Sequence, residues 1–143
     1  MTINDEPFDF EPLPVGATLP AEAKFEQARE AKLSEINSAF NAAAAALTDG
    51  YPEAERTTWA TQQKEALAWG ADPAAPTPYL DGLAAARGIL AEEMRQKTLD
   101  QTQLFMVASQ QLVGTRQRLR DLAYDAKTQV ELDGIKWSSA ETT

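Results

Sequence analysis

Two pairs of carboxylates are the side chains in this sequence best suited to acid–base or metal chemistry. Glu92 and Glu93 are adjacent, whereas Asp121 and Asp125 are separated by one turn of a helix. A pair of this kind could share a proton or bind a cation. Neither pair has a His, a Cys or a glycine-rich loop beside it. We therefore interpret both as parts of solvated helix faces that carry ion pairs.

Three arginines lie close together in the same part of the chain, at Arg116, Arg118 and Arg120. Arginines at this spacing could clamp phosphate or carboxylate groups. Asp121 and Asp125 lie among them, so the local charge is nearly balanced. This balance favours a salt-bridged surface or a protein contact over a nucleic-acid site.

The composition leaves little room for catalysis. The 143 residues include no Cys and no His. Their absence removes thiol nucleophiles, disulfides, histidine-based triads and nearly all zinc sites. No phosphate-binding loop, dinucleotide-binding glycine motif or nucleophile elbow is present either. We expect a protein that is not an enzyme and that uses no cofactor and no metal.

The net charge is −9, from 22 acidic and 13 basic residues. This charge argues against binding to nucleic acid and against docking on an anionic membrane. No stretch approaches the roughly 20 apolar residues of a membrane span, and the acidic start does not resemble a signal peptide. We expect a soluble, cytoplasmic protein. Solubility alone accounts for the charge, with attraction to a basic partner as the alternative.

The elements that would position these side chains are all helices. Apolar residues recur at helical spacing of three and four, as in Phe25, Ala28, Leu33, Ile36 and Phe40. No strand pattern stands out. The fold class that we predict is a small all-α bundle with one long C-terminal helix. The expected elements are helices at 20–48, 52–69, 78–88 and 89–126 and a last short turn at 128–134.

Proline, threonine and glycine mark the ends of these helices. Thr77 offers a hydroxyl N-cap to the helix that starts at Pro78. Gly70 and Gly88 are predicted to end their helices as C-caps. On the helix at 52–69, the side predicted to face inward carries Trp59, Ala66 and Leu67. Trp59 is expected in the core and Trp137 is expected to fold back onto the bundle, while Trp69 has no assigned place.

The long helix carries a seam whose spacing alternates between three and four, as in a coiled coil. Thr98, Gln101 and Thr115 are polar members of this seam, so a bundle or a helix bent at Gly114 is as well supported as a regular coil. Self-association through this helix is an open alternative. The predicted seam is Ala91, Met94, Thr98, Gln101, Phe105, Ala108, Leu112, Thr115, Leu119, Leu122 and Ala126.

The chain divides into a flexible acidic arm at 1–19, a helical domain at 20–137 and a disordered tail at 138–143. The arm holds four acidic residues and no Lys or Arg, with Phe8 and Phe10 between the acids. A disordered arm is the favoured interpretation. A short segment that orders on a partner is the alternative.

Several sequence blocks together resemble a known family. They are ERTTWATQQKEALAW (55–69), APTPYLDGLAAARGI (75–89), LVGTRQRLRDLAYDAKT (112–128) and the closing IKW. This region is similar to the C-terminal part of small tail-fibre assembly proteins from tailed phages, prophages and R-type pyocin clusters. The positions that match are Trp59, Gln63, Glu65, Ala66, Thr77, Pro78, Leu80, Asp81, Arg87, Gly88, Gly114, Arg116, Gln117 and Trp137.

The resemblance implies a chaperone that helps a long trimeric fibre protein fold or trimerise in the host cytoplasm, without catalytic residues. The alternative is a structural tail or baseplate component that remains in the virion. We expect the partner in a groove between the long helix and the helices at 20–48 and 52–69, although core packing is the competing role for its residues. The candidate partner contacts are Phe40, Trp69, Phe105, Leu112 and Trp137, together with Phe8 and Phe10 in the arm.

Overall fold

The computed structural model describes residues 20–138, and this part of the chain is helical without any strand. The predicted all-α fold is therefore confirmed. The predicted arm at 1–19, and residues 139–143 of the predicted tail, lie outside the described residues. The helices are α1 (Ala21–Thr48), α2 (Glu53–Arg56), α3 (Trp59–Ala71), α4 (Pro78–Arg87), α5 (Ala91–Asp125) and α6 (Gln129–Asp133).

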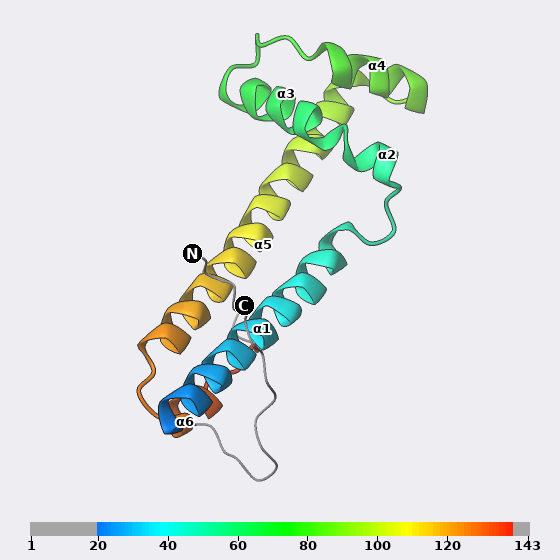
Figure 1. The fold of residues 1–143 in the computed structure, drawn as a ribbon. Helices are drawn as coiled ribbons and strands as arrows, with labels where there is room; N and C mark the ends of the chain where they lie inside the picture. Colours follow the sequence, from blue (N-terminus) through cyan, green and yellow to red (C-terminus); the bar gives the residue numbers. More distant parts are fainter. Residues whose placement is uncertain (1–19, 139–143) are drawn as a thin grey trace, which may run out of the picture.

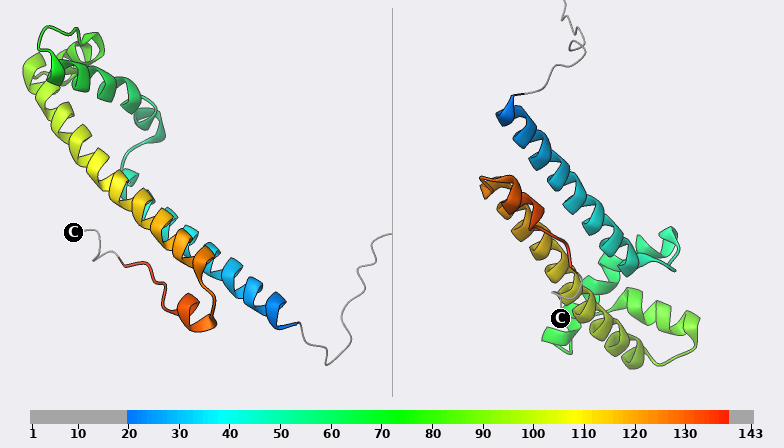
Figure 2. Two further views of the ribbon diagram at one scale, coloured as in Figure 1. Left: turned by 90° about the vertical axis from the view of Figure 1, so that its left-hand side faces the viewer. Right: turned by 90° about the horizontal axis from the view of Figure 1, so that it is seen from below.

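The two long helices, α1 and α5, lie side by side and run antiparallel, so that they form a rod (Figure 1). α3 and α4 pack against the N-terminal end of α5 and form a head at one end of the rod. α6 packs against α1, and Figure 2 shows it at the end of the rod opposite the head. The chain is thus elongated, with smaller helices clustered at its two ends.

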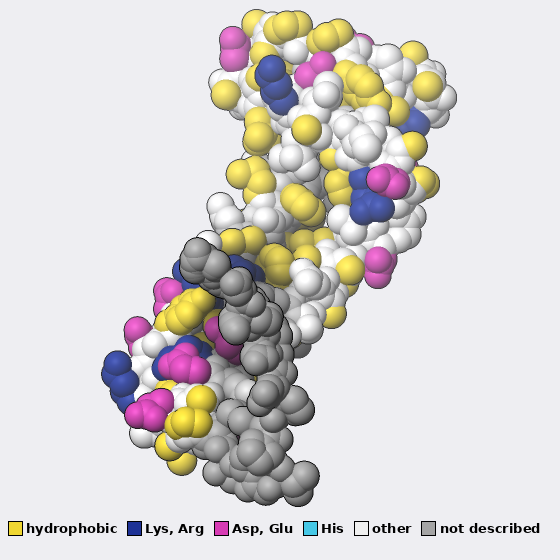
Figure 3. Space-filling view, in the orientation of Figure 1, with side chains coloured by type: hydrophobic (Ala, Val, Ile, Leu, Met, Phe, Trp, Pro, Cys, Tyr) yellow, Lys and Arg dark blue, Asp and Glu magenta, His cyan; other side chains and the backbone are white. Residues whose placement is uncertain are grey.

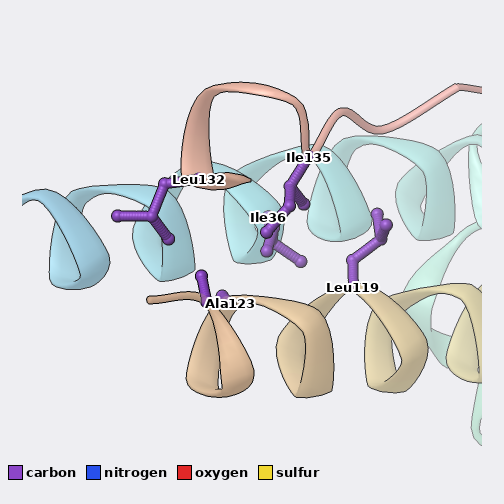
Figure 4. Close-up of a cluster of buried hydrophobic side chains, with 6 residues drawn as sticks. Ile36, Leu119, Ala123, Leu132 and Ile135 are labelled. Atoms are coloured by element: carbon purple, nitrogen blue, oxygen red, sulfur yellow. The ribbon is translucent and has the colours of Figure 1, made fainter. Parts of the chain in front are cut away.

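The buried apolar residues form two separate clusters, one at each end of the rod. The basal core joins α1, the end of α5 and the α6 segment (Figure 4). The head core joins α3, α4 and the start of α5. The basal core consists of Ile36, Leu119, Ala123, Ala126, Leu132 and Ile135. The head core consists of Ala66, Leu80, Ala84 and Met94.

The prediction of one continuous helix over 52–69 was wrong. The helix breaks at Thr57 and Thr58, between α2 and α3. The Thr57 hydroxyl donates a hydrogen bond to the carbonyl oxygen of Ala54 (2.8 Å), and the Thr58 hydroxyl donates to that of Glu55 (2.7 Å). Threonine side chains that bond to nearby backbone offer it an alternative to the helical ladder.

Two further predictions about α3 fail for reasons of packing. Gly70 lies inside the helix, which continues to Ala71, and the structure gives it no left-handed backbone. A Cβ at Gly70 would lie 3.0 Å from a methyl group of Leu99, so this glycine allows α3 to approach α5 closely. Leu67 was expected to face inward, but 41% of it is exposed.

The turn between α4 and α5 matches the sequence prediction. Gly88 has a φ of 78°, which places it in the left-handed region that favours glycine. Its N–H donates to the carbonyl oxygen of Ala84 (2.9 Å), and the N–H of Ile89 donates to the same oxygen (3.0 Å). These bonds close the end of α4. α5 then begins at Ala91 and passes through Gly114 as one helix.

The inner face of α5 differs from the predicted seam at two positions. Thr102 and Ala123 are buried, whereas the predicted Gln101 and Leu122 are exposed. A strict 3.5-residue seam applies to supercoiled helices, whereas an α-helix with 3.6 residues per turn drifts away from it. Thr98 is buried, and its hydroxyl donates to the carbonyl oxygen of Met94 (2.8 Å), so its polar group is satisfied.

Two cations of α1 attach this helix to the far end of the chain. Arg29 donates to carbonyl oxygens at the end of α5, among them those of Tyr124 (2.9 Å) and Ala126 (3.3 Å). Lys32 donates to the carbonyl oxygen of Ile135 (2.9 Å). The last carbonyls of a helix lack partners within it, and a cation there also opposes the helix dipole. These contacts therefore stabilise the basal end of the rod.

Candidate partner-binding groove

An open apolar groove runs between the C-terminal half of α1 and the middle of α5. It has a volume of about 200 Å³, and only two of its lining residues, Thr48 and Ser109, are polar. We call it the waist groove, because it lies between the two cores. Its lining is Phe40, Ala44, Leu47, Thr48, Phe105, Ser109, Leu112 and Val113.

The groove is open partly because Ala44, one of the four α1 residues that line it, has a small side chain. Residues 42–46 are five consecutive alanines. Alanine is the best helix former, so this stretch keeps α1 helical. Its methyl groups are too short to fill the space between two long helices, and the space therefore stays unfilled between Phe40 and Leu47.

A wider cleft adjoins the waist groove on its head side. It lies between α3 and α5 and has a volume of about 700 Å³. We call it the head cleft. Leu47 and Phe105 line both hollows, so the two are continuous. The other residues that line the head cleft are Tyr51, Glu55, Trp59, Gln62, Gln63, Arg87, Met94, Lys97, Thr98, Asp100, Gln101 and Thr102.

A chain of aromatic rings crosses the boundary between the two hollows. Tyr51 meets Trp59 edge to face at 5.1 Å between ring centroids, and Trp59 meets Phe105 at 6.2 Å. Edge-to-face pairs at such distances are attractive and directional. The stack holds the start of α3 against α5 and fixes the orientation of Phe105. The shared wall of the groove is therefore preformed.

The waist carries no charged side chain on either long helix. There is none between Glu35 and Asp49 in α1, and none between Asp100 and Arg116 in α5. On the face in Figure 3, the side chains along the middle of α5 and the C-terminal half of α1 are hydrophobic or uncharged. Val113, which lines the waist groove, is 39% exposed. Apolar surface gathered in this way is typical of an interaction site.

The structure brings three of the predicted contact residues together. Phe40, Phe105 and Leu112 all line the waist groove. Trp137 does not line it, but it folds back onto the basal core as predicted and meets Phe40 edge to face at 6.4 Å. Trp69 is half-buried on α3 and lines neither hollow. The remaining candidates, Phe8 and Phe10, lie outside the described residues.

Sequence reasoning did not single out Leu47, Val113 or Tyr51 as site residues, yet all three line the hollows. It also assigned Trp59 to the core, whereas this residue is half-buried in the wall of the head cleft. The signal that could have found them is the absence of charge from 36–48 and 101–115. Apolar spacing alone cannot separate a groove wall from a core.

Several of the charged groups singled out in the sequence have structural partners. Asp121 pairs with Arg120 at 3.0 Å, and Glu93 pairs with Lys97 at 3.8 Å. Within residues 20–138, no cluster of three or more acidic, His or Cys side chains could hold a metal ion.

Arg116 closes the basal end of the waist groove. Its guanidinium donates to the side-chain oxygen of Asn37 (2.9 Å) and lies 5.9 Å from the centroid of the Phe40 ring. A guanidinium over an aromatic face is attracted to the ring electrons. Arg116 therefore holds Phe40 in place and puts a positive charge beside an otherwise uncharged groove.

Of the four sequence blocks quoted above, 55–69 and 75–89 build the head, whereas 112–128 and the closing IKW contribute to the basal core. The Glu65 carboxylate accepts the backbone N–H groups of Tyr79 (3.0 Å) and Leu80 (2.9 Å), so it caps α4 from the neighbouring helix. The predicted N-cap by the Thr77 hydroxyl is wrong. That hydroxyl instead donates to Asp81 (2.9 Å) and accepts from Arg95 (2.8 Å).

Comparison of the chain with protein-family models, with curated proteins and with solved structures found no match. In the described part of the chain, no helix is both long enough and apolar enough to cross a bilayer. A functional proposal therefore depends on the geometry of the groove and on the residues that line it.

Proposed function

We propose that this protein is a phage tail-fibre assembly chaperone that holds an apolar segment of the fibre protein in the waist groove. The observation that carries the proposal is an apolar groove, open to solvent, at the uncharged middle of the rod. The resemblance of residues 51–137 to tail-fibre assembly proteins suggests the identity of the partner. Both features indicate binding of a polypeptide rather than chemistry on a small molecule.

The size of the groove suits single side chains. An apolar cavity of about 150 Å³ accommodates benzene, so the waist groove of about 200 Å³ accommodates one phenyl ring or branched side chain. Burying one such side chain contributes about 1.5–3 kcal/mol. A few side chains therefore give weak and reversible binding, because association itself is costly. Reversible binding is what a chaperone needs in order to release its product.

A trimeric fibre has a specific need for such help. Before its three chains close, they expose strand edges and apolar seams that promote aggregation. A groove that covers one apolar segment reduces this exposure until the trimer forms. The acidic chain then adds solubility to the complex, since its net charge is −9.

The test is co-expression with a tail-fibre protein from the same genome. Val113→Glu places a charge in the waist groove, at a residue that is 39% exposed and therefore free of core packing. We expect the yield of soluble trimeric fibre, measured by size-exclusion chromatography, to fall at least tenfold. The matched control is Val107→Glu on the same helix, which is 53% exposed and lines neither hollow. Equal yields from the two variants would contradict the proposal.

The composition of purified particles distinguishes the chaperone from the alternative, a structural tail or baseplate component. A chaperone that releases its product is absent from mature virions or is present at a variable, low level. A structural tail or baseplate component is present at a fixed copy number per tail. Quantitative mass spectrometry of particles that yields such a fixed number would replace the chaperone proposal with the structural one.

A further inference from the structure

The chain contains a segment of its own whose pattern suits the waist groove. Phe8, Asp9, Phe10 and Glu11 alternate between aromatic and acidic side chains. In an extended chain, alternate residues face the same side, about 7 Å apart. Phe8 and Phe10 would therefore face one way and the two acids the other. The waist groove and the head cleft offer adjoining hollows that share Leu47 and Phe105.

The length of the arm matches the distance to the groove. The groove spans Phe40 to Thr48 on α1, which lies 20 to 28 residues after Pro20. At 1.5 Å per residue, it extends from about 30 to about 42 Å along the rod. Phe10 and Phe8 precede Pro20 by 10 and 12 residues. At about 3.3 Å per extended residue, they reach about 33 and 40 Å.

The spacer between these aromatics and α1 favours such an extended course. Proline fixes its own φ and biases the residue before it away from helical geometry, so a sequence with Pro12 and Pro14 favours extended conformations, which span about 3.1 Å per residue in a polyproline helix. The reach along α1 therefore has little slack. A strap that starts at Pro20 and runs beside α1 places its aromatic pair at the groove, and a spacer several residues shorter would stop short of it.

Charge favours the same position. Residues 1–19 hold four acids and no Lys or Arg, so they contribute −4 of the total of −9 and leave −5 on the remainder. The groove offers Arg116 at its basal end, and Arg87 and Lys97 in the adjoining head cleft. Only Glu55 and Asp100 oppose them there. Three cations against two acids leave the two hollows with a net charge of about +1, so this part of the molecule repels the acidic arm less than the remainder, which carries −5 in all.

We propose that Phe10 occupies the waist groove and Phe8 the adjoining head cleft of their own chain, as an intramolecular strap that a partner segment displaces. This regulation rests on the proposed function, because it concerns the same groove. A short tether gives an effective concentration in the millimolar range, so even a weak contact is substantially occupied. The strap thereby covers the apolar waist in the free protein and yields to a tighter partner.

A spin label on the arm of the full chain tests this proposal. The chain has no cysteine, so Asn4→Cys provides a single labelling site that changes neither the aromatic pair nor an acid. We expect a nitroxide there to lower the amide NMR intensities of residues 40–48 and 105–113 at least twofold, relative to the reduced label. Amides of α6, which lies at the basal end and therefore far from a label that the strap carries toward the head, serve as the internal reference. Groove amides that lose no more intensity than those of α6 would overturn the strap.

Two variants of the labelled chain test separately whether the aromatic side chains hold the arm in place and whether the spacer must be long enough to reach the groove. Phe8→Ala with Phe10→Ala should restore the intensities by removing the side chains that fill the groove. Deletion of residues 13–17 should also restore them, because the shortened spacer reaches only about 16 Å. Replacement of the same five residues by Ser-Gly-Ser-Gly-Ser keeps the length and should keep the effect. An effect that survives the deletion would contradict the proposal.

Mixing distinguishes a strap within one chain from exchange between two chains. Labelled protein without ¹⁵N is combined with ¹⁵N protein that carries no label. We expect no loss of intensity in the mixture. A loss as large as in the singly prepared sample would assign the groove to the arm of a second copy and would overturn the intramolecular strap. Because no fibre protein is present, neither result affects the chaperone proposal.

Discussion

Arg29 makes two kinds of contact, and only one of them should matter for stability. Its pair with Glu26 joins neighbouring turns of α1, and the Glu26 side chain is 62% exposed. Exposed pairs of this kind contribute between about 0 and 1 kcal/mol. Its bonds to the end of α5 join residues almost a hundred positions apart, and the Arg29 side chain is only 13% exposed. The second set holds the basal end together.

This difference gives a prediction about single substitutions. Arg29→Ala should lower the free energy of unfolding by about 1.5–3 kcal/mol, because backbone carbonyls lose a charged donor. Glu26→Ala should lower it by less than about 0.5 kcal/mol. Urea unfolding followed by circular dichroism measures both. Equal losses would mean that the ion pair, and not the helix cap, stabilises this end.

At the scale of elements, the middle of α1 and the middle of α5 pack less fully than their ends. The alanine run at 42–46 maintains the helix, and Ala44 within it is too small to fill the waist groove. A protein selected for stability alone would fill this space with larger side chains. The open groove is therefore consistent with a binding role, in which stability is given up for a free surface.

Filling the groove should separate stability from function. Ala44 lines the groove, so Ala44→Leu should bury added carbon atoms and raise the free energy of unfolding by up to about 2 kcal/mol. The same variant should abolish the increase in soluble fibre on co-expression. Ala42→Leu, on the exposed side of α1, is the matched control and should leave both properties unchanged. A filled groove that still supports full fibre yield would exclude it as the binding site.

At the scale of the whole molecule, the two cores form separate units on a shared rod. The head core and the basal core have no residue in common, and α5 is the element that contributes to both. Each small core stabilises the helices at its own end. The waist between them contains few buried contacts. Local opening of one end is therefore expected to leave the other end folded.

Matched cavity substitutions in the two cores test this division. Leu80 and Leu132 are the largest fully buried side chains, at 0% and 1% exposure, and they lie in different cores. Each change to Ala should cost about 2–5 kcal/mol locally. Amide hydrogen exchange should then accelerate in α3 and α4 for Leu80→Ala, and in α6 and the start of α1 for Leu132→Ala. Uniform acceleration in both variants would show a single cooperative unit.

The sequence by itself determined the helical class and most helix boundaries, because these depend on neighbours within about four residues. Gly88 ends α4 through its own backbone, and the stripe from Phe25 to Leu47 selects the inner face of α1. The resemblance to tail-fibre assembly proteins was also carried by local blocks. The uncharged stretches at 36–48 and 101–115 are also visible in the sequence. The sequence does not show that they face each other across a groove.

Only the tertiary structure decided which apolar residues form a core and which form the wall of a groove. Ile36 is buried whereas Phe40, one turn further, lines the waist groove, although both belong to the same helical stripe. Glu65 caps a helix that starts 13 residues later, and Arg29 caps one that ends about a hundred residues away. These outcomes depend on how closely two helices approach at each point of their length. That separation is set by side chains distant in the sequence, so no local pattern contains it.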